Sequence, residues 1–461
     1  MHVHYYKQFY TGPDSPGTQQ PRELAATLAR RGHKVDVVAT DFNVYSEQSE
    51  RAELIQFAGG GEVRVHRLPT ARGLRSGLLA RLRSYLGFVW PALQKGLSLT
   101  APDVVIGSIQ PLFTGWVALG VARRRRAPLI LEVRDLWPDA LEAKGAVTGV
   151  AARLLHFAAD GLYARADRIV SLTPGIKVEL LKKGVNPSRL DVFPNGFSPE
   201  LFRIEQGDRE AVRRRYGWGE SFVALYAGTH TEVTAVDVIV RAAAELRHRP
   251  GIRLDLFGRG QTKARAMELA RELGLVNVHF HDPVGKNAIP ALIDAADVCV
   301  MALFRSPLIH IYFENKFVDY LGAGKPVVAS MGGQQAELLR RLRAGRVVPS
   351  MDHEGLAGLI AEAADNPDAL KTMGENGRRF VERSLLLPMI LERYADTVEA
   401  VANGTAAGVS PWEPFDLAIT SEMATSEGAM KVIVTASESG SIFSAVMNRI
   451  DVPSTKTARS A

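Results

Sequence analysis

The polar segment from Glu314 to Ser330 carries residues that could hold a phosphorylated ligand. Asn315 and Lys316 open a short helical run, which ends at Gly322–Gly324 before an apolar strand. The free N–H groups of a helix start, together with a lysine, favour an anion such as a diphosphate. Asp319 follows Lys316 by three residues, so both side chains share one helix face with Asn315. A carboxylate there can accept hydrogen bonds from sugar or ribose hydroxyls, and the segment predicts a nucleotide-sugar site.

Two further candidate segments follow predicted strands in the first half of the chain. Gly17 and Thr18 lie before a helix that begins at Pro21, and a glycine lets the backbone approach a phosphate closely. Arg134 and Asp135 come directly after a buried strand, at the edge where ligands of such sheets bind. An ordinary turn and a salt-bridged strand end are the structural alternatives, and spacing alone does not decide between them.

Two similar segments lie in the second half. Gly228 ends an apolar strand and His230 follows it, in what is otherwise an ordinary strand-to-helix loop. Arg259 stands between two glycines, and Lys263 follows as a second cation that could contact phosphate. The glycines alone are a weak match to a dinucleotide fingerprint, because the third glycine and a downstream acid are missing. A solvated helix start is the structural alternative for this segment.

The composition bounds the function classes. The chain has 461 residues, 46% hydrophobic and 23% charged, which is a globular composition with enough apolar residues for two or three domains. Its net charge of +6 favours acidic partners such as nucleic acid, anionic lipid or phosphorylated substrates. The sequence has no zinc-finger spacing and no basic run with interleaved aromatic residues, so no nucleic-acid partner is expected.

Cysteine usage and apolar runs bear on metal sites and on location. The single cysteine, Cys299, lies in an apolar strand and is expected to be a small core residue, without a disulfide or a thiolate zinc site. No run reaches the roughly 18 apolar residues that a spanning helix needs. The first residues lack the apolar core of a signal peptide, so we expect a cytoplasmic protein.

Apolar strands alternate with amphipathic helices through most of the chain. The predicted strands are Val3–Tyr6, Val35–Ala39, Val63–Arg67, Val104–Ser108, Leu129–Val133, Ile169–Leu172, Val192–Phe193, Phe222–Ala227, Arg253–Phe257, Val278–Phe280, Val298–Ala302, Val327–Ser330 and Val347–Val348. Continuous apolar strands joined by helices predict parallel sheets buried on both faces. Two such sets predict an α/β fold of two Rossmann-like, doubly wound domains that face a ligand-binding cleft.

Turn residues and composition set the predicted domain limits. The turn-rich stretch Phe193–Phe202 predicts a boundary, with one domain over residues 1–203 and the next over residues 204–382. Residues 383–403 are expected to form a helix that packs back on the first domain. Residues 404–461 are rich in Ala, Ser, Thr and Gly and are expected to be a disordered tail.

The segment that begins at Glu314 resembles the donor-binding signature of the retaining glycosyltransferases of family 4, which have the two-domain GT-B fold. The family pattern reads roughly Pro-Ser-Lys-x-x-Glu-Tyr-x-Ala-x-Gly-x-Pro-Val, and the resemblance extends over about residues 1–403. It implies that Asn315, Lys316 and Phe317 contact the nucleotide sugar and that Asp319 is catalytic.

The other candidate segments stand at positions of the same family. The sequence GTQQPRELAATLARRGHKVDVVA resembles the family's amino-terminal donor loop, and Arg134-Asp135 stands where a His-Asp pair is frequent. The run Arg-Asp-Leu-Trp-Pro is similar to a subgroup of surface-polysaccharide transferases, the WbuB and WcaI type. The resemblance implies a catalytic location for Arg134 and Asp135. It implies donor-binding roles for Gly17, Thr18, Gly228, His230, Arg259 and Lys263.

Together these features predict a hexosyl- or N-acetylhexosaminyltransferase. By resemblance, it would retain the anomeric configuration while moving a sugar from a nucleotide diphosphate, expected to be UDP, to a polyprenyl-diphosphate-linked saccharide in surface polysaccharide synthesis. No Asp-x-Asp motif occurs, so no metal and no cofactor are expected, and the helix dipole and lysines would act instead. A UDP-sugar 2-epimerase of the same architecture and a non-catalytic nucleotide-sugar-binding subunit are the alternatives.

Residues 72–100 combine leucines with arginines and aromatic side chains. This pattern predicts an interfacial membrane helix over Arg72–Trp90, and a solvated helix packed on the first domain is the alternative. The run Arg123–Arg126 either complements a helix carboxyl terminus or adds a second basic patch. We therefore expect a peripheral protein that binds an anionic membrane surface at the inner face of the plasma membrane.

Overall fold

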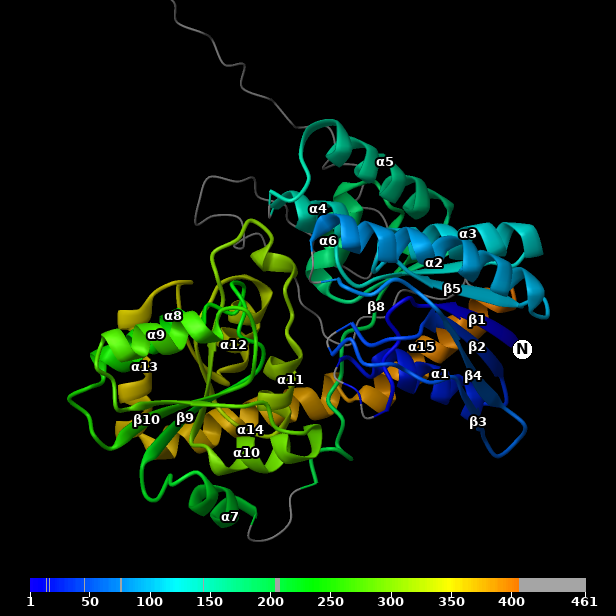
Figure 1. Ribbon diagram of the computed structural model, residues 1–461. Helices are drawn as coiled ribbons and strands as arrows, with labels where there is room; N and C mark the ends of the chain where they lie inside the picture. Colours follow the sequence, from blue (N-terminus) through cyan, green and yellow to red (C-terminus); the bar gives the residue numbers. More distant parts are fainter. Residues whose placement is uncertain are drawn as a thin grey trace, which may run out of the picture. The chain divides into compact units, whose positions relative to one another are not determined.

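The computed structural model describes residues 1–405 except 14, 16, 45, 75, 76, 144 and 204–207 (Figure 1). Met1–Phe415 is one compact unit, and all described residues belong to it. The predicted tail lies outside the described residues from position 406 onward. The predicted domain limit falls between residues 203 and 204, and residues 204–207 also lie outside the described residues. The domain limits therefore stay predictions.

An eight-stranded sheet forms the first half of the described chain. Its strand order is β3-β4-β2-β1-β5-β6-β7-β8, and each neighbouring pair is parallel except β3 with β4. The strands are β1 (His2–Tyr6), β2 (Lys34–Thr40), β3 (Glu53–Gln56), β4 (Glu62–Leu68), β5 (Val104–Ser108), β6 (Leu129–Val133), β7 (Arg168–Ser171) and β8 (Leu190–Val192). Strands β5, β6 and β7 are buried along their whole length, as parallel strands between layers of helices are.

Helices connect these strands. They are α1 (Gln20–Arg30), α2 (Leu78–Ser98), α3 (Leu112–Arg125), α4 (Trp137–Ala143), α5 (Gly149–Arg165), α6 (Pro174–Lys182) and the 3-10 helix η1 (Pro187–Arg189). Helix α1 has a proline in its first turn, where a missing N–H costs nothing, and buries Leu24, Ala25 and Leu28. This is the apolar stripe that the sequence predicts for a helix beginning near Pro21.

A six-stranded parallel sheet forms the second half, in the order β11-β10-β9-β12-β13-β14. Its strands are β9 (Phe222–Ala227), β10 (Ile252–Phe257), β11 (Val278–His281), β12 (Val298–Ala302), β13 (Val327–Ser330) and β14 (Gly345–Val348). The helices are α7 (Asp208–Arg215), α8 (Val236–Glu245), α9 (Lys263–Glu272), η2 (Lys286–Ala288), α10 (Ile289–Ala295), η3 (Ile309–Ile311), α11 (Asn315–Gly322), α12 (Gly333–Leu342), α13 (His353–Asp365) and α14 (Pro367–Ser384). The predicted α/β architecture of two doubly wound domains is confirmed.

Each sheet has its own hydrophobic core. The first core includes Tyr6 and Leu131, and the second includes Tyr226 and Leu254, all of them fully buried. Burial of one such large side chain contributes about 1.5–3 kcal/mol. Cys299 is fully buried in β12, which confirms the prediction that it is a core residue.

The last described helix, α15 (Leu387–Ala402), packs against α1 of the first half (Figure 1). Arg31, at the end of α1, forms ion pairs with three carboxylates of α15, those of Glu392 at 2.5 Å, Asp396 at 2.9 Å and Glu399 at 3.2 Å. His33 also contacts Glu399, with 2.8 Å between Nε2 and Oε1. The chain thus returns to its first sheet after it has completed the second.

Candidate functional site

Each sheet has one point at which the strand order reverses. These points lie between β1 and β5 in the first sheet and between β9 and β12 in the second. Ligands of doubly wound sheets bind outside the carboxyl ends of the strands at such points. The loop after β1 carries Gly17 and Thr18, and the loop after β9 carries Gly228 and His230. The predicted site residues therefore lie at the edges of the sheets where this fold class binds ligands.

Lys316 lies in the first turn of α11 and has two partners there. Its Nζ is 3.0 Å from Glu314 Oε2, donates a hydrogen bond of 3.2 Å to the Tyr226 hydroxyl, and lies 4.9 Å from the centre of the Tyr226 ring. Burial alone would lower the pKa of Lys316, but Glu314 and Tyr226 outweigh burial and raise this pKa above its ordinary value. Lys316 is therefore a fixed positive charge beside the helix start.

The backbone at Gly228 runs close to this lysine. A Cβ atom at Gly228 would lie 3.2 Å from Lys316 Nζ. Gly258, which has a φ of +144°, lies against the backbone of Gly228, and a Cβ atom at Gly258 would be only 1.8 Å from the carbonyl oxygen of Gly228. A side chain at Gly258 would therefore clash with the loop after β9, and one at Gly228 would crowd the lysine, so both positions favour glycine.

His230 is fully buried within this loop. Its ring meets the Tyr226 ring edge to face at 5.6 Å, and neither ring nitrogen has a hydrogen-bond partner among the described residues. Burial, with a smaller contribution from the nearby Lys263 and Lys316, lowers the pKa of His230 to about 4, so the imidazole is neutral at pH 7. The ring therefore supports the loop from within, and the predicted donor-binding role of His230 stays a prediction.

The two predicted cations after β10 differ in their surroundings. Lys263 Nζ donates hydrogen bonds to the backbone carbonyls of Gly258 at 2.9 Å and His281 at 2.7 Å, and it pairs with Asp282 at 3.2 Å. These contacts hold Lys263 against the backbone of the loop after β10. The Arg259 side chain is exposed, and no described residue pairs with it. Arg259 is therefore the better placed of the two to contact an incoming anion.

Two more predicted site residues lie on α11. The side chain of Phe317 is fully buried and packs edge to face against Phe313 at 5.8 Å, and its predicted donor-binding role stays a prediction. Asp319 is half-buried, and Lys316 of the same predicted face forms its ion pair with Glu314. No described residue donates a hydrogen bond to the Asp319 carboxylate, and burial raises the pKa of Asp319 to about 7. This carboxylate is thus available to hydroxyl groups of a ligand.

Arg134 is buried, with 5% of its surface exposed, at the carboxyl end of β6. Its guanidinium donates hydrogen bonds to Gln20 Oε1 at 2.8 Å and to Asn195 Oδ1 at 3.0 Å, and it lies 3.7 Å from Glu132 Oε1. The neighbouring Asp135 accepts a hydrogen bond of 2.5 Å from Gln110 Nε2. The predicted pair therefore lies at the expected sheet edge, with Arg134 engaged by protein groups.

Asn195 contacts three predicted site residues, although its own sequence context predicts only a turn. Its Oδ1 accepts hydrogen bonds from Arg134 Nη2 at 3.0 Å and from Thr18 Oγ1 at 3.3 Å. Its Nδ2 donates to Asn315 Oδ1 at 2.5 Å. The next residue, Gly196, packs closely against α15, because a Cβ atom there would lie 2.6 Å from Leu387 Cα. The loop after β1, the end of β6 and the start of α11 thus meet at one amide.

Lys286 holds the Gly17 loop from the second half. Its Nζ donates hydrogen bonds to the backbone carbonyls of Ser15 at 3.2 Å and Gly17 at 3.3 Å. Gly17 has a φ of +132°, which favours glycine. No local sequence pattern predicts this contact, because the two segments are far apart along the chain.

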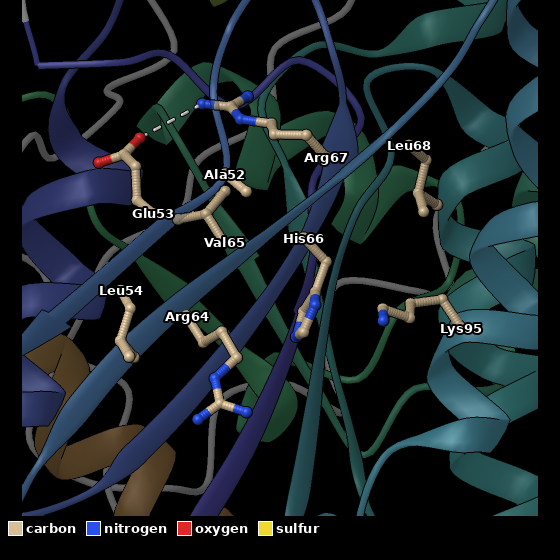
Figure 2. Close-up of a pocket in the computed structure, with 9 residues that line it drawn as sticks. All are labelled: Ala52, Glu53, Leu54, Arg64, Val65, His66, Arg67, Leu68 and Lys95. Atoms are coloured by element: carbon tan, nitrogen blue, oxygen red, sulfur yellow. Dashed lines mark ion pairs between the residues drawn. The ribbon is translucent and has the colours of Figure 1, made fainter.

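A separate surface pocket of about 430 Å³ lies over β3 and β4, at one edge of the first sheet (Figure 2). Figure 2 shows Glu53 paired with Arg67, with His66 near the centre of the view and Lys95 toward the right. The pocket is lined by Ala52, Glu53, Leu54, Arg64, Val65, His66, Arg67, Leu68 and Lys95. None of the predicted site residues is among these, so the pocket is distinct from the candidate site.

Comparisons with known proteins agree with this fold. Residues 17–196 match the family Glycosyl transferase 4-like domain, and residues 221–366 match Glycosyl transferases group 1. HepE of Anabaena, solved in complex with UDP-glucose, superposes with a TM-score of 0.65 at 17% identity, over 87% of this chain and 100% of that one. WaaG, a glycosyltransferase involved in lipopolysaccharide biosynthesis, superposes with a TM-score of 0.62 at 20% identity, over 86% of this chain and 99% of that one.

The chain has the GT-B fold of glycosyltransferases. The GT-B halves also match curated proteins by sequence. The D-inositol 3-phosphate glycosyltransferase of Streptomyces coelicolor is 30% identical over 294 residues, which are 58% of this chain and 62% of that relative. The putative colanic acid biosynthesis glycosyl transferase WcaI of Escherichia coli is 25% identical over 316 residues, 66% of this chain and 76% of that relative. The chain thus spans less than two thirds of the first relative.

Proposed function

We propose that the protein is a glycosyltransferase that takes its sugar from a nucleoside diphosphate sugar, with UDP as the nucleotide. The observation that carries the proposal is the fixed charge of Lys316 at the start of α11, next to the closely packed Gly228 and Gly258. Backbone that a phosphate can approach, a helix start and a lysine form the standard setting for a diphosphate. Solved neighbours of the same fold hold UDP or UDP-glucose, which supports the choice of nucleotide.

The charges of the site indicate how a diphosphate would be held. Glu314 partly neutralises Lys316, so the lysine alone would be a modest anion site. The exposed Arg259 adds a cation without a described partner, and the first-turn N–H groups of α11 add the positive end of a helix dipole. Together they would stabilise the negative charge that develops on the leaving diphosphate.

Asp319 is the residue that we assign to the hydroxyl groups of the donor. It has no described hydrogen-bond donor, and it lies one turn after Lys316 on α11. A ribose or sugar hydroxyl that donated to this carboxylate would replace the hydrogen bonds it lost on burial. Asp319 would therefore fix the orientation of the sugar relative to the diphosphate.

We propose a retaining reaction that needs no divalent metal. The bond between the sugar carbon and the diphosphate oxygen breaks, the acceptor hydroxyl bonds to that carbon from the same face, and the leaving phosphate takes the acceptor proton. The protein then contributes positioning and electrostatic stabilisation rather than a nucleophile. Arg134 and Asp135 stay candidates for this region, with Arg134 acting through Asn195 on Thr18 and Asn315.

For the acceptor we propose a polyprenyl-diphosphate-linked saccharide of surface polysaccharide synthesis. The similarity to WcaI supports this class, and so does the exposed surface of α2. Leu79, Arg83, Leu86 and Trp90 recur at helical spacing and form one stripe of α2, with Leu79 83% and Trp90 64% exposed. A basic and apolar stripe of this kind fits an anionic lipid surface.

A hollow of about 530 Å³ adjoins the stripe and is lined by Ala71, Arg72, Leu79, Ala80 and Arg83. Helix α5 has exposed apolar side chains of its own, Val150, Leu154 and Phe157. In the predicted second basic patch, Arg125 donates to the carbonyl of Leu99 at 3.2 Å and so caps α2, whereas Arg123 and Arg124 are exposed. No described helix is long and apolar enough to cross a bilayer. We propose peripheral attachment at the inner face of the plasma membrane.

One assay tests the proposed function against its alternatives. Purified protein is incubated with a panel of UDP-sugars, with and without a membrane extract, and the products are identified by mass spectrometry. Glycosyl transfer that requires the extract and is lost in Lys316→Ala supports the proposal. Conversion of the UDP-sugar without an acceptor identifies an epimerase. Tight binding of a UDP-sugar with no turnover across broad acceptors identifies a binding subunit.

A further inference from the structure

Four metal-ligating side chains gather on one face of the first sheet, near the amino ends of β1 and β2. His2 and His4 alternate along β1, and the strand register pairs His4 with Asp36 of β2. The register of β2 and β4 pairs Val38 with His66, so His66 shares the face of Asp36. This cluster belongs to the opposite end of β1 from the loop that carries the candidate site.

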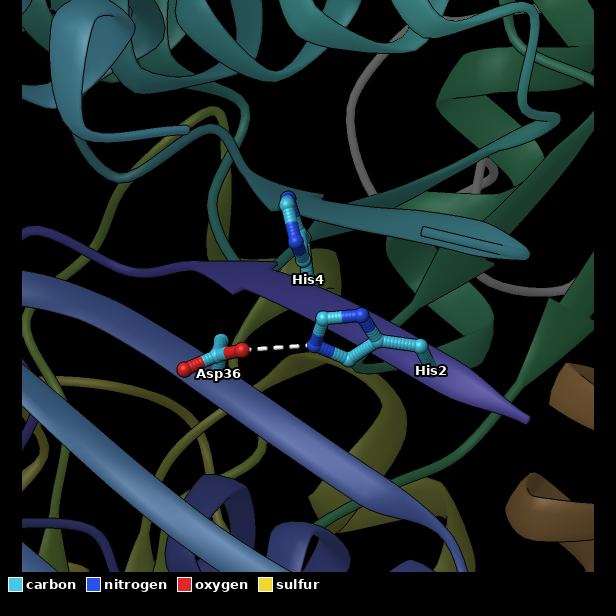
Figure 3. A group of neighbouring side chains, drawn as sticks. All are labelled: His2, His4 and Asp36. Atoms are coloured by element: carbon cyan, nitrogen blue, oxygen red, sulfur yellow. Dashed lines mark hydrogen bonds and ion pairs between the residues drawn. The ribbon is translucent and has the colours of Figure 1, made fainter. Parts of the chain in front are cut away.

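The side chains are close enough to surround one ion. His2 Nε2 lies 2.5 Å from Asp36 Oδ2, and the His2 and His4 rings meet edge to face at 4.9 Å (Figure 3). One ligand atom from each of His2, His4 and Asp36 lies within 4.8 Å of the other two. A tetrahedral ion with bonds of about 2.0–2.2 Å needs ligand atoms roughly 3.3 Å apart, so small side-chain rotations suffice.

His4 is the least explained member of the cluster. It is fully buried, and its Nε2 has no hydrogen-bond partner among the described residues. Its Nδ1 lies 3.4 Å from the Tyr6 hydroxyl, a long contact. A buried polar atom without a partner calls for an explanation, and a bound ion supplies one.

His66 completes the arrangement from outside. Its Nε2 lies 2.6 Å from Asp36 Oδ1, the carboxylate oxygen that does not contact His2. Partners that hold a ligand by its second atom fix the ligand's orientation and strengthen metal binding. The His2 and Asp36 side chains keep 16% and 13% of their surface exposed, which gives an ion a path to the cluster.

We propose that His2, His4 and Asp36 bind one Zn²⁺ ion, with His66 orienting Asp36. Two imidazole nitrogens and one carboxylate oxygen are donors that suit Zn²⁺, whereas Mg²⁺ and Ca²⁺ prefer oxygen alone. Binding would replace the direct contact between His2 Nε2 and Asp36 Oδ2 with bonds from both atoms to the ion. The ion would join β1 to β2 at the amino edge of the sheet. It would act on stability and would not take part in the transfer reaction proposed at the opposite edge.

The test uses the full chain without an affinity tag, treated with EDTA and then freed of it. Zn²⁺ is titrated against a chromophoric chelator, and the melting temperature is followed with and without Zn²⁺. We expect one Zn²⁺ per chain and a higher melting temperature. Asp36→Asn and His2→Gln should weaken binding by at least about 100-fold, more than the roughly 10–100-fold expected for the outer residue in His66→Gln.

Controls separate this site from general metal binding. His248 is an exposed histidine of the second half, and His248→Gln should bind Zn²⁺ as the unmodified chain does. Mg²⁺ at the same concentration should not compete. Circular dichroism of the metal-free variants checks that they fold. Asp36→Asn preserves the shape of the side chain, so it remains a valid test if His2→Gln does not fold. Equal Zn²⁺ affinity in the unmodified chain and in a folded Asp36→Asn variant, or no binding at all, would overturn the proposal.

Discussion

The side-chain amide of Asn195 donates a hydrogen bond of 2.5 Å to Asn315 Oδ1, and so connects the segment after β8 to the first turn of α11. The other end of the same amide accepts hydrogen bonds from Thr18 and Arg134. A change in the position of α11 would therefore alter the hydrogen bonds of Asn195 and, through this side chain, the position of Thr18 in the Gly17 loop.

Asn195→Asp should isolate this connection. The aspartate keeps an oxygen for Thr18 and Arg134 but lacks the N–H that Asn315 accepts. Loss of one neutral hydrogen bond costs about 1 kcal/mol, so we expect roughly fivefold weaker binding of UDP-glucose by calorimetry. Asn195→Ala also deprives the buried Arg134 of a partner and should lower the free energy of unfolding by about 1–3 kcal/mol. Unchanged affinity in Asn195→Asp would show that the connection is structural only.

Lys316 and Glu314 make a matched pair of tests. Lys316→Ala should cost roughly 1.5–3 kcal/mol of nucleotide binding, the value of a lost charged hydrogen bond. Glu314→Gln leaves the lysine in place without the carboxylate that neutralises it, and should strengthen diphosphate binding. Calorimetry with UDP measures both, with Lys371→Ala of α14 as an exposed control. The assignment fails if Lys316→Ala binds UDP as the unmodified chain does.

The raised pKa of Asp319 predicts a pH dependence of donor binding. If sugar or ribose hydroxyls donate to the carboxylate, affinity should rise with pH until it levels off near 7, the pKa of the free protein. A UDP-sugar is the right probe, because the terminal phosphate of free UDP itself titrates near 6. In Asp319→Asn the affinity should be the same at about pH 5.5 and about pH 8, which lie on either side of the pKa of about 7. Calorimetry at each pH measures this affinity. A step that persists in this variant would assign the titration to another group.

The same shift has a consequence for stability. A carboxyl group whose pKa is higher in the folded state favours folding while it is protonated. This contribution is complete below the ordinary value of 3.8 and is lost as the pH rises to about 7. Asp319→Asn should therefore gain stability relative to the unmodified chain at pH 8 and not at pH 4. Denaturant unfolding at both pH values measures the difference.

Removal of divalent metals separates the two proposals made above. EDTA should leave the initial rate of glycosyl transfer unchanged, because Lys316, Arg259 and the start of α11 are proposed to stabilise the leaving diphosphate in place of a metal ion. EDTA should lower the melting temperature if His2, His4 and Asp36 hold Zn²⁺. Loss of the rate on chelation, with recovery on addition of magnesium or manganese, would refute the metal-independent reaction and leave the zinc site untouched.

The exposed stripe of α2 predicts binding to anionic membranes. Each basic side chain near an anionic surface contributes about 1 kcal/mol, screened by salt, so binding should fall as salt rises. Charge reversal at Arg75, Arg81 and Arg83 should release the protein from anionic liposomes, although Arg75 lies outside the described residues. Reversal of Arg214 and Arg215 on α7 is the matched control. Equal sedimentation of the triple variant and the unmodified chain would show that α2 is only a solvated helix.

The sheets could be predicted because their chemistry is local. Each predicted strand overlaps an observed one, since a buried parallel strand is a continuous apolar run. Strand β3 was missed because Glu53–Gln56 alternates exposed and half-buried residues and pairs antiparallel at the sheet edge. No continuous apolar run marks such a strand.

Side-chain roles could be predicted less well, because they depend on burial and on distant partners. Lys263 and Phe317 have suitable types at suitable positions, but backbone carbonyls hold the first and the core encloses the second. Asn195 and Lys286 were missed for the converse reason. Their partners, Asn315 and Gly17, lie 120 and 269 positions away along the chain. No local pattern encodes such contacts.

The packing of α15 on α1 has a consequence for protein synthesis. The ribosome releases the strands of the first sheet early, but α15 follows roughly 200 residues later, a delay of about 10–40 s at ordinary translation rates. Throughout that interval Arg31 lacks its three carboxylates, and the surface of α1 that α15 will cover faces solvent. The nascent first half must therefore keep this surface of α1 uncovered until α15 has been synthesised.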